Sequence, residues 1–125
     1  MRTRLVSAAF LLLVALSASV LAHTSQVILD ARKVQGTVRS ASAVVPAGAV
    51  SVRVVVDAKP KKAGDLVWRL WLSTNDGQTW TVIHTETESL ARTFALLPSH
   101  EGNRLLVELD SLDELKAAVE LRWGL

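Results

Sequence analysis

The sequence predicts an all-β protein, a two-sheet antiparallel β-sandwich of the jelly-roll or immunoglobulin-like kind. From about residue 50 onward, apolar residues alternate with polar ones, a pattern typical of strands that bury one face. Turn-forming residues separate these segments, so that seven or eight short strands follow one another at spacings near ten residues. Strands with one apolar face each are best buried by packing two sheets face to face.

Residues 1–22 have the pattern of a cleavable secretory signal. Arg2 and Arg4 precede an apolar run from Leu5 to Leu16, and Ala22 ends the segment with a small side chain. We therefore expect export to the periplasm or the extracellular space, with cleavage after Ala22. The alternative is an uncleaved anchor helix, although the apolar run is short for a membrane span. No second apolar stretch reaches membrane length, so we expect no membrane-spanning segment in the mature chain.

Residues 23–125 are expected to form a single domain, because about 100 residues suffice for one ordinary core. The chain has no cysteine, so this core must hold without disulfides. Two of the 14 basic residues, Arg2 and Arg4, lie in the signal, which leaves 12 basic residues against 12 acidic ones. A net charge near zero argues against a nucleic-acid partner, whose phosphates require a basic surface.

The expected strands follow directly from the alternation of apolar residues. Weaker candidates lie upstream, at 27–29 and 34–45. The stronger ones are 52–56, 66–72, 80–83, 94–96, 105–109 and 119–123. Proline, glycine and asparagine mark loops at 46–48, 59–64, 75–77 and 98–103.

A short helix is predicted at 112–118, between the last two strands. Ser111 and Glu114 have the spacing of a capping box, in which serine caps the first turn and glutamate follows at its third position. Leu112, Leu115 and Val119 would then share one helical face. The alternative is a plain hairpin loop.

The segment Ser73-Thr74-Asn75-Asp76-Gly77-Gln78-Thr79-Trp80 predicts a β-hairpin. Gly77 tolerates a positive φ, Asn75 or Asp76 can accept hydrogen bonds from turn amides, and Trp80 can pack over the turn. The segment resembles the Asp-box of sialidase-like secreted proteins, with Asn75 at the aspartate position, and also the hairpin of discoidin-type β-sandwich modules. In those families the motif is structural, so the resemblance implies no activity.

The sequence favours a protein that is not an enzyme. Ser99, His100 and Glu101 are adjacent on one loop, and adjacent side chains rarely converge on one point as a catalytic triad requires. Carboxylates such as Glu86 and Glu108 could pair for glycoside hydrolysis, but they lie where solvated carboxylates commonly lie on strands.

The tryptophans suggest a carbohydrate ligand. Trp68, Trp80 and Trp123 fall on the inward phase of their strands and are expected in the core, whereas Trp71 falls on the outward phase. An exposed indole beside polar groups is a common platform for sugar rings, and Arg69 and Thr81 are predicted to flank it. The alternative is that Trp71 is covered, by residues 23–35 or by a partner protein.

A second hypothesis makes the chain a structural or assembly subunit. Val55, Trp71 and Ile83 would then form an outer face that docks on another protein. The order of Val45-Pro46-Ala47-Gly48-Ala49 and the following strand resembles small β-sandwich modules of bacterial surface and phage virion proteins. The sequence does not indicate an oligomeric state.

A third hypothesis is a copper site. Cleavage after Ala22 would make His23 the first residue, and a terminal histidine chelates Cu(II) through its amine and imidazole. His84 or His100 would supply the second imidazole, as in the histidine brace of small exported β-sandwiches. The alternative is that a histidine merely follows the cleavage site. No other cofactor is expected.

Overall fold

The computed structural model describes residues 23–125, and the predicted secretory signal, residues 1–22, lies outside them. The described part is all-β, as the sequence predicts. Within residues 23–125, no helix is long and apolar enough to cross a membrane. The elements in chain order are β1 (His23–Arg39), β2 (Ala43–Val44), β3 (Ser51–Ala58), β4 (Leu66–Ser73), β5 (Thr81–Glu86), β6 (Ala91–Ala95), the short 3-10 helix η2 (Pro98–His100) and β7 (Arg104–Gly124).

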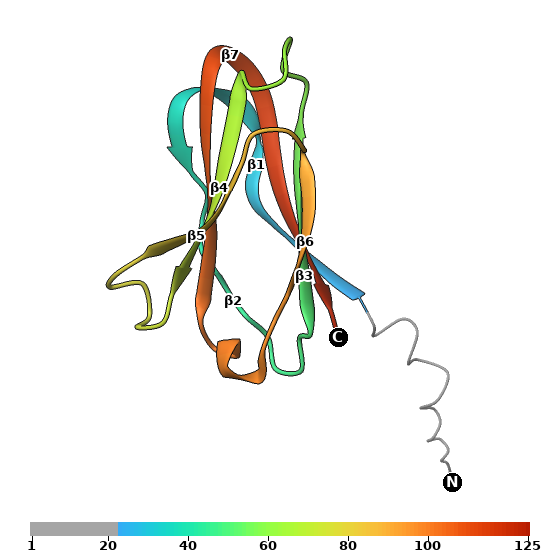
Figure 1. The fold of residues 1–125 in the computed structure, drawn as a ribbon, viewed down its shortest axis with the longest axis vertical. Helices are drawn as coiled ribbons and strands as arrows, with labels where there is room; N and C mark the ends of the chain where they lie inside the picture. Colours follow the sequence, from blue (N-terminus) through green and yellow to red (C-terminus); the bar gives the residue numbers. More distant parts are fainter. Residues whose placement is uncertain (1–22) are drawn as a thin grey trace, which may run out of the picture.

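The strands form one antiparallel sheet that curls around the core. Its order is β5-β4-β7-β3-β6, and β1 and β2 also pair with β7. Strand β7 bends over at one end of the molecule (Figure 1). Its first arm, residues 104–111, pairs with β4, and its second arm, residues 117–124, pairs with β3. Strand β1 bends with it and pairs with both arms.

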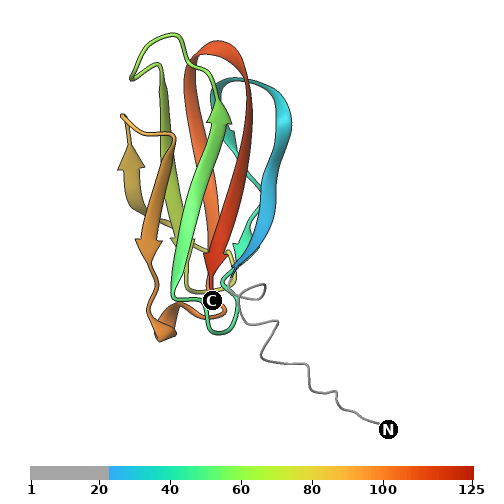
Figure 2. The same ribbon diagram turned by 90° about the vertical axis from the view of Figure 1, so that its right-hand side faces the viewer.

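The core lies inside this curl and follows the predicted alternation. Alternate residues of β3, of β4 as far as Leu70 and of both arms of β7 are buried, including Val52, Val54, Val56, Trp68, Leu70, Val107, Leu109, Val119, Leu121 and Trp123. The intervening residues form the outer face. Figure 2 looks onto the outer face of one side of the curl, where β6, β3, the second arm of β7 and β1 lie side by side.

The predicted helix at 112–118 is wrong. Strand β7 continues through this segment, and Leu115 and Lys116 pair with Val34 and Lys33 of β1. The Ser111 hydroxyl donates to the carbonyl of Asp113 instead of capping a helix. Pairing with β1 and the burial of Ala117 and Val119 on alternate positions outweigh the local capping signal.

Two strands are much longer than the sequence indicates. The weak candidates at 27–29 and 34–45 lie largely within the single strand β1, and the separate strands expected at 105–109 and 119–123 are the two arms of β7. Strand β1 contains three register shifts, the first between Val27 and Leu29. Such irregularities let a strand bend without losing its partner.

Candidate functional site

The segment from Ser73 to Trp80 forms a tightly hydrogen-bonded hairpin turn. The Ser73 hydroxyl accepts a bond from the Gly77 amide at 2.8 Å, and the Asn75 side-chain oxygen accepts one from the Thr79 amide at 2.9 Å. Gly77 has a φ of 87°, the positive value that the sequence predicts. Asp76 instead pairs with Arg104 of β7, at 2.7 Å. The segment therefore holds the turn against the sheet.

The predicted core position of Trp80 is wrong, whereas Trp68 and Trp123 are core residues as expected. Trp80 precedes β5 and is half-buried, because it packs on the turn and not inside the curl. A Cβ atom placed on Gly77 would lie 3.6 Å from the Trp80 ring.

Trp71 lies on the outer face of β4, but its ring is covered. The Arg39 guanidinium of β1 lies 4.6 Å from the ring centroid, in cation–π geometry. Arg39 also donates to the Glu108 carboxylate at 3.0 Å, and Arg69 reaches the other oxygen of Glu108 at 3.4 Å. Within residues 23–125, the Trp71 indole N–H is buried and makes no hydrogen bond. The predicted sugar platform is thus occupied by an arginine of the same chain.

The register of β5 separates Thr81 from Trp71. An irregularity between Leu70 and Trp71 places Val82 opposite Trp71 and Thr81 opposite Leu72. Arg69 is adjacent to Trp71 in β4, but its guanidinium pairs with Glu108. The structure therefore does not bring Arg69, Trp71 and Thr81 together as one ligand site.

The residues of the predicted docking face lie on different parts of the curl. Val55 lies opposite Glu120, on the second arm of β7. Trp71 lies opposite Leu106, on the first arm. Ile83 lines a small cavity of about 100 Å³ together with buried core residues. These three side chains do not form one surface.

His84 and His100, two of the histidines of the predicted copper site, have separate surroundings. His84 Nε2 lies 2.9 Å from Glu86 Oε1, and its ring packs against Phe94 with centroids 5.0 Å apart. The Nδ1 atom of His100 accepts the Leu97 amide at 2.9 Å. His23 begins β1, opposite Gly124. Within residues 23–125, no three His, Cys, Asp or Glu side chains gather as a metal site would require. Copper binding stays a prediction.

Glu86 joins β5 to β6 through a buried carboxylate. It accepts hydrogen bonds from Arg92 Nε at 2.6 Å and from the amides of Glu88 and Ser89 at 3.0 Å. These bonds, with Arg92 first and the His84 ring next, hold the pKa of Glu86 well below its usual range. A carboxylate held ionised in this way fastens two strands together and is a poor proton donor.

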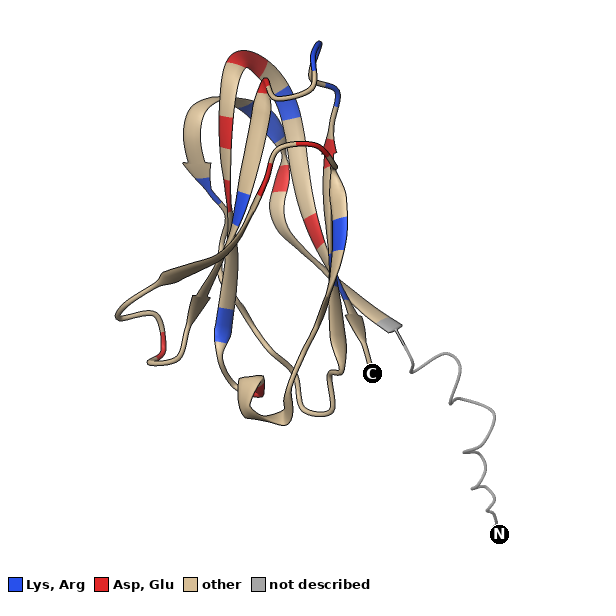
Figure 3. Ribbon diagram, in the orientation of Figure 1, with Lys and Arg blue, Asp and Glu red and all other residues tan. Residues whose placement is uncertain are grey.

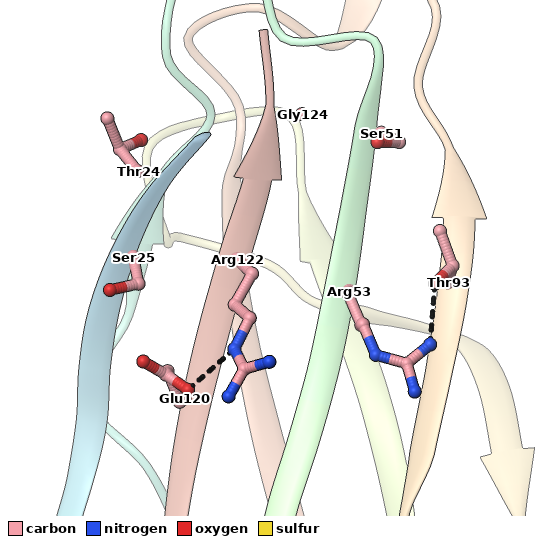
Figure 4. A pocket seen from close by; sticks show the side chains of 8 residues that line it. All are labelled: Thr24, Ser25, Ser51, Arg53, Thr93, Glu120, Arg122 and Gly124. Atoms are coloured by element: carbon pink, nitrogen blue, oxygen red, sulfur yellow. Dashed lines mark hydrogen bonds and ion pairs between the residues drawn. The ribbon is translucent and has the colours of Figure 1, made fainter. Parts of the chain in front are cut away.

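A groove of about 680 Å³ lies on the outer face of β1, the second arm of β7, β3 and β6. Figure 4 shows its side chains, which come from all four strands. They are mostly hydroxyl-bearing or charged, and include Ser25, Ser51, Arg53, Thr93, Glu120 and Arg122. The sequence alone did not indicate this groove. Arg53 and Arg122 are both on the outward phase of predicted strands, but alternation alone does not show which strands are neighbours.

Two arginines occupy paired positions on neighbouring strands of the groove. Arg53 of β3 is the register partner of Arg122, which in turn lies opposite Ser25 of β1. Arg122 Nε donates to Glu120 at 2.8 Å, whereas Arg53 Nη1 donates to the neutral hydroxyl of Thr93 at 3.0 Å. Among residues 23–125, Arg53 makes no ion pair with a carboxylate. The groove lining therefore carries a net positive charge.

Gly124 shapes one end of the groove. A Cβ atom at this position would collide with the Ser51 hydroxyl. The absence of a side chain lets Ser51 lie over the β7 backbone, opposite Gly124 in the register.

A second hollow of about 540 Å³ continues the groove along the strands. It shares Glu120 and Arg122 with the first, and the rest of its lining is largely apolar, with Val27, Val55 and Ala118. The two hollows together give this outer face a polar end and an apolar end.

No family model matches the chain, and no curated protein does. Among solved structures, the chain is similar to the Yersinia pseudotuberculosis-derived mitogen (YPM), with a TM-score of 0.50. The two are 12% identical, and the match covers 82% of this chain and 85% of that one. At this identity the likeness concerns the fold alone and agrees with an all-β protein.

Proposed function

We propose that the chain is an exported, non-catalytic β-sandwich module that binds carbohydrate in the groove between β1 and β6. The observation that carries the proposal is the lining of this groove by hydroxyls and arginines on four paired strands. Sites that recognise polar ligands combine a concave surface with a few well-placed hydrogen-bonding groups. Paired strands hold such groups in fixed positions more accurately than loops do.

The lining suits sugar hydroxyls in particular. The side chains of Thr24, Ser25, Ser51 and Thr93 each donate and accept hydrogen bonds, as sugar hydroxyls do. The proposed ligand therefore lies in the groove and not on Trp71, whose ring is covered by Arg39.

A glycan array tests the proposal. The array carries uronic-acid, sialic-acid and sulfated glycans beside their neutral counterparts. We expect the protein to bind at least one class of glycan. The Ser25→Trp variant should lose that binding, because a large side chain on exposed Ser25 fills the groove. The matched control is Gln35→Trp, also exposed on β1 but not part of the groove lining. No binding by the protein, or equal binding by both variants, would overturn the proposal.

A different observation favours the second candidate, an assembly subunit. Val50, Leu97 and Leu125 are 62%, 60% and 43% exposed. Val50 and Leu97 line one hollow. The Val50 amide donates a hydrogen bond to the carbonyl of Gly124, the residue before Leu125. Few charges lie at this end of the molecule (Figure 3). Exposed apolar side chains gathered in this way are typical of protein interfaces.

Size-exclusion chromatography with mass measurement tests this candidate. If the apolar end is an interface between copies, the protein is an oligomer and Leu97→Asp makes it monomeric. Leu112→Asp is the control, since Leu112 is 73% exposed at the opposite, bent end of β7. A monomer at all concentrations would contradict self-assembly through this end.

A further inference from the structure

We infer that the ligand of the groove carries a negatively charged group, a carboxylate or a sulfate, which binds between Arg53 and Arg122. This inference rests on the proposed carbohydrate function and specifies the class of saccharide. It is carried by the register pairing of Arg53 with Arg122 and by the hydrogen-bond partners that the two side chains have.

Two arginines at paired positions of neighbouring strands are unfavourable when no ligand is bound. Like charges directly opposite one another on neighbouring strands repel and destabilise the pair. Arg53 and Arg122 are register partners on β3 and β7, and Glu120 is the one acidic side chain that lines the groove with them. An anionic ligand between the two guanidinium groups would convert this repulsion into attraction.

Most of the hydrogen-bonding capacity of both arginines is available to a ligand. A guanidinium has five N–H donors in a fixed plane, which match the two oxygens of a carboxylate or sulfate. In the structure, Arg122 donates to Glu120 and Arg53 to Thr93, through one nitrogen each. Figure 4 shows both side chains over the same face of the sheet, with Arg53 turned toward Thr93 and Arg122 running along β7 beside Glu120. Both residues are exposed, so their remaining nitrogens can reach a ligand that spans the two strands.

The hydroxyl groups around the two arginines favour a saccharide as the molecule that carries the negative charge. Ser25 lies beside Arg122, and Thr93 lies beside Arg53, in one row across the four strands. A sugar ring with an acidic substituent can place the charge between the arginines and its hydroxyls against these side chains. A simple inorganic anion would use the arginines and make no contact with the more distant hydroxyls.

Calorimetric titration tests the inference with the acidic glycan that binds best on the array, with its carboxyl-reduced or desulfated counterpart, and with poly-glutamate. The variants are Arg53→Gln and Arg122→Gln. Arg32→Gln is the control, since Arg32 is an exposed β1 arginine that does not line the groove. Melting curves verify that each variant is folded, as expected for exposed positions.

We expect the acidic glycan to bind at least about tenfold more tightly than its neutral counterpart. Each groove variant should weaken it by about ten- to a hundredfold, the effect of one charge-assisted hydrogen bond, and Arg32→Gln should not. Binding should also weaken as salt rises, because the arginines are exposed.

Two other outcomes separate the inference from the proposed function. Equal binding of acidic and neutral glycans, unchanged in both groove variants, would overturn the inference and leave the carbohydrate function standing. Binding of poly-glutamate that depends on Arg53 and Arg122, with no glycan bound, would overturn the carbohydrate function and retain an anion site that recognises an acidic protein segment.

Discussion

At the scale of single residues, Gly77 holds the most demanding backbone position of the hairpin turn. Its φ of 87° is strained for any residue with a side chain, and its amide donates to Ser73. A Cβ at this position would also contact the Trp80 ring at 3.6 Å. That distance is an ordinary van der Waals contact, so the turn depends on glycine for its backbone conformation.

We expect Gly77→Val to lower the free energy of unfolding by about 1–3 kcal/mol, because valine is strained at positive φ. Urea denaturation measures the change. Gln78→Val, at the exposed neighbouring position, is the control and should change stability by less than about 0.5 kcal/mol. Equal stability of Gly77→Val and the wild type would contradict the observed turn.

Trp68 and Trp71 should respond very differently to truncation. Trp68 is fully buried and donates from its indole to the Ser89 carbonyl at 2.8 Å, so Trp68→Ala should cost about 3–5 kcal/mol. Trp71→Ala loses a ring on the outer face and a cation–π contact of about 0.5–1 kcal/mol. Thermal melting compares the two, and glycan binding should survive in Trp71→Ala. A folded Trp71→Ala that binds no glycan would place the ligand on the indole instead.

At the scale of elements, the corner between β5 and β6 depends on Glu86. Its carboxylate accepts hydrogen bonds from Arg92, from the His84 ring and from two loop amides. Trp68 adds a bond to the same loop at Ser89. These contacts link two strands that lie at opposite ends of the sheet order, so they help to hold the curl closed.

This corner makes stability dependent on acid. The pKa of Glu86 is lower in the folded protein than the ordinary value of about 4.3 expected for the unfolded chain. The unfolded state therefore takes up this proton first, so the stabilisation is complete above about pH 4.3 and is lost as pH falls further. Denaturation curves from pH 7 to pH 2 should show a steeper loss below pH 4.3 for the wild type than for Glu86→Gln.

Glu101→Gln, in an exposed loop, is the matched control for this acid dependence and should follow the wild-type curve. The Glu86→Gln protein should also be less stable at pH 7, because an amide cannot pair with Arg92 as a carboxylate does. If its stability falls with acid as steeply as that of the wild type, Glu86 is not the group responsible.

The elements also show what the sequence could and could not predict. Strands such as β3 and β4 were predictable because alternation depends only on which side of a strand faces the core. The helix expected at 112–118 was wrong because the capping signal is local, whereas the pairing of Leu115 with Val34 joins residues far apart in the chain. Residue spacing carries no information about such pairing.

At the scale of the whole molecule, the candidate site is a product of strand register. Arg53 and Arg122 become neighbours because β3 and the second arm of β7 pair, and Thr93 and Ser25 extend the row on either side. Sequence patterns placed Arg53 and Arg122 on the outward phase of their strands but could not align the two strands. The alternation in β4 predicted an exposed Trp71 and hence a sugar platform. In the structure, Arg39 of β1 covers its ring.

The central claim is that the ligand lies in this groove, and amide chemical-shift mapping tests it most directly. Isotope-labelled protein is titrated with the glycan that binds best on the array, and two-dimensional amide spectra are recorded. We predict that the largest shifts cluster at Ser25, Ser51, Arg53, Thr93 and Arg122, with little change at Arg39, Arg69 and Trp71. Shifts centred on Trp71 and Arg69, with those of the groove unchanged, would contradict the account.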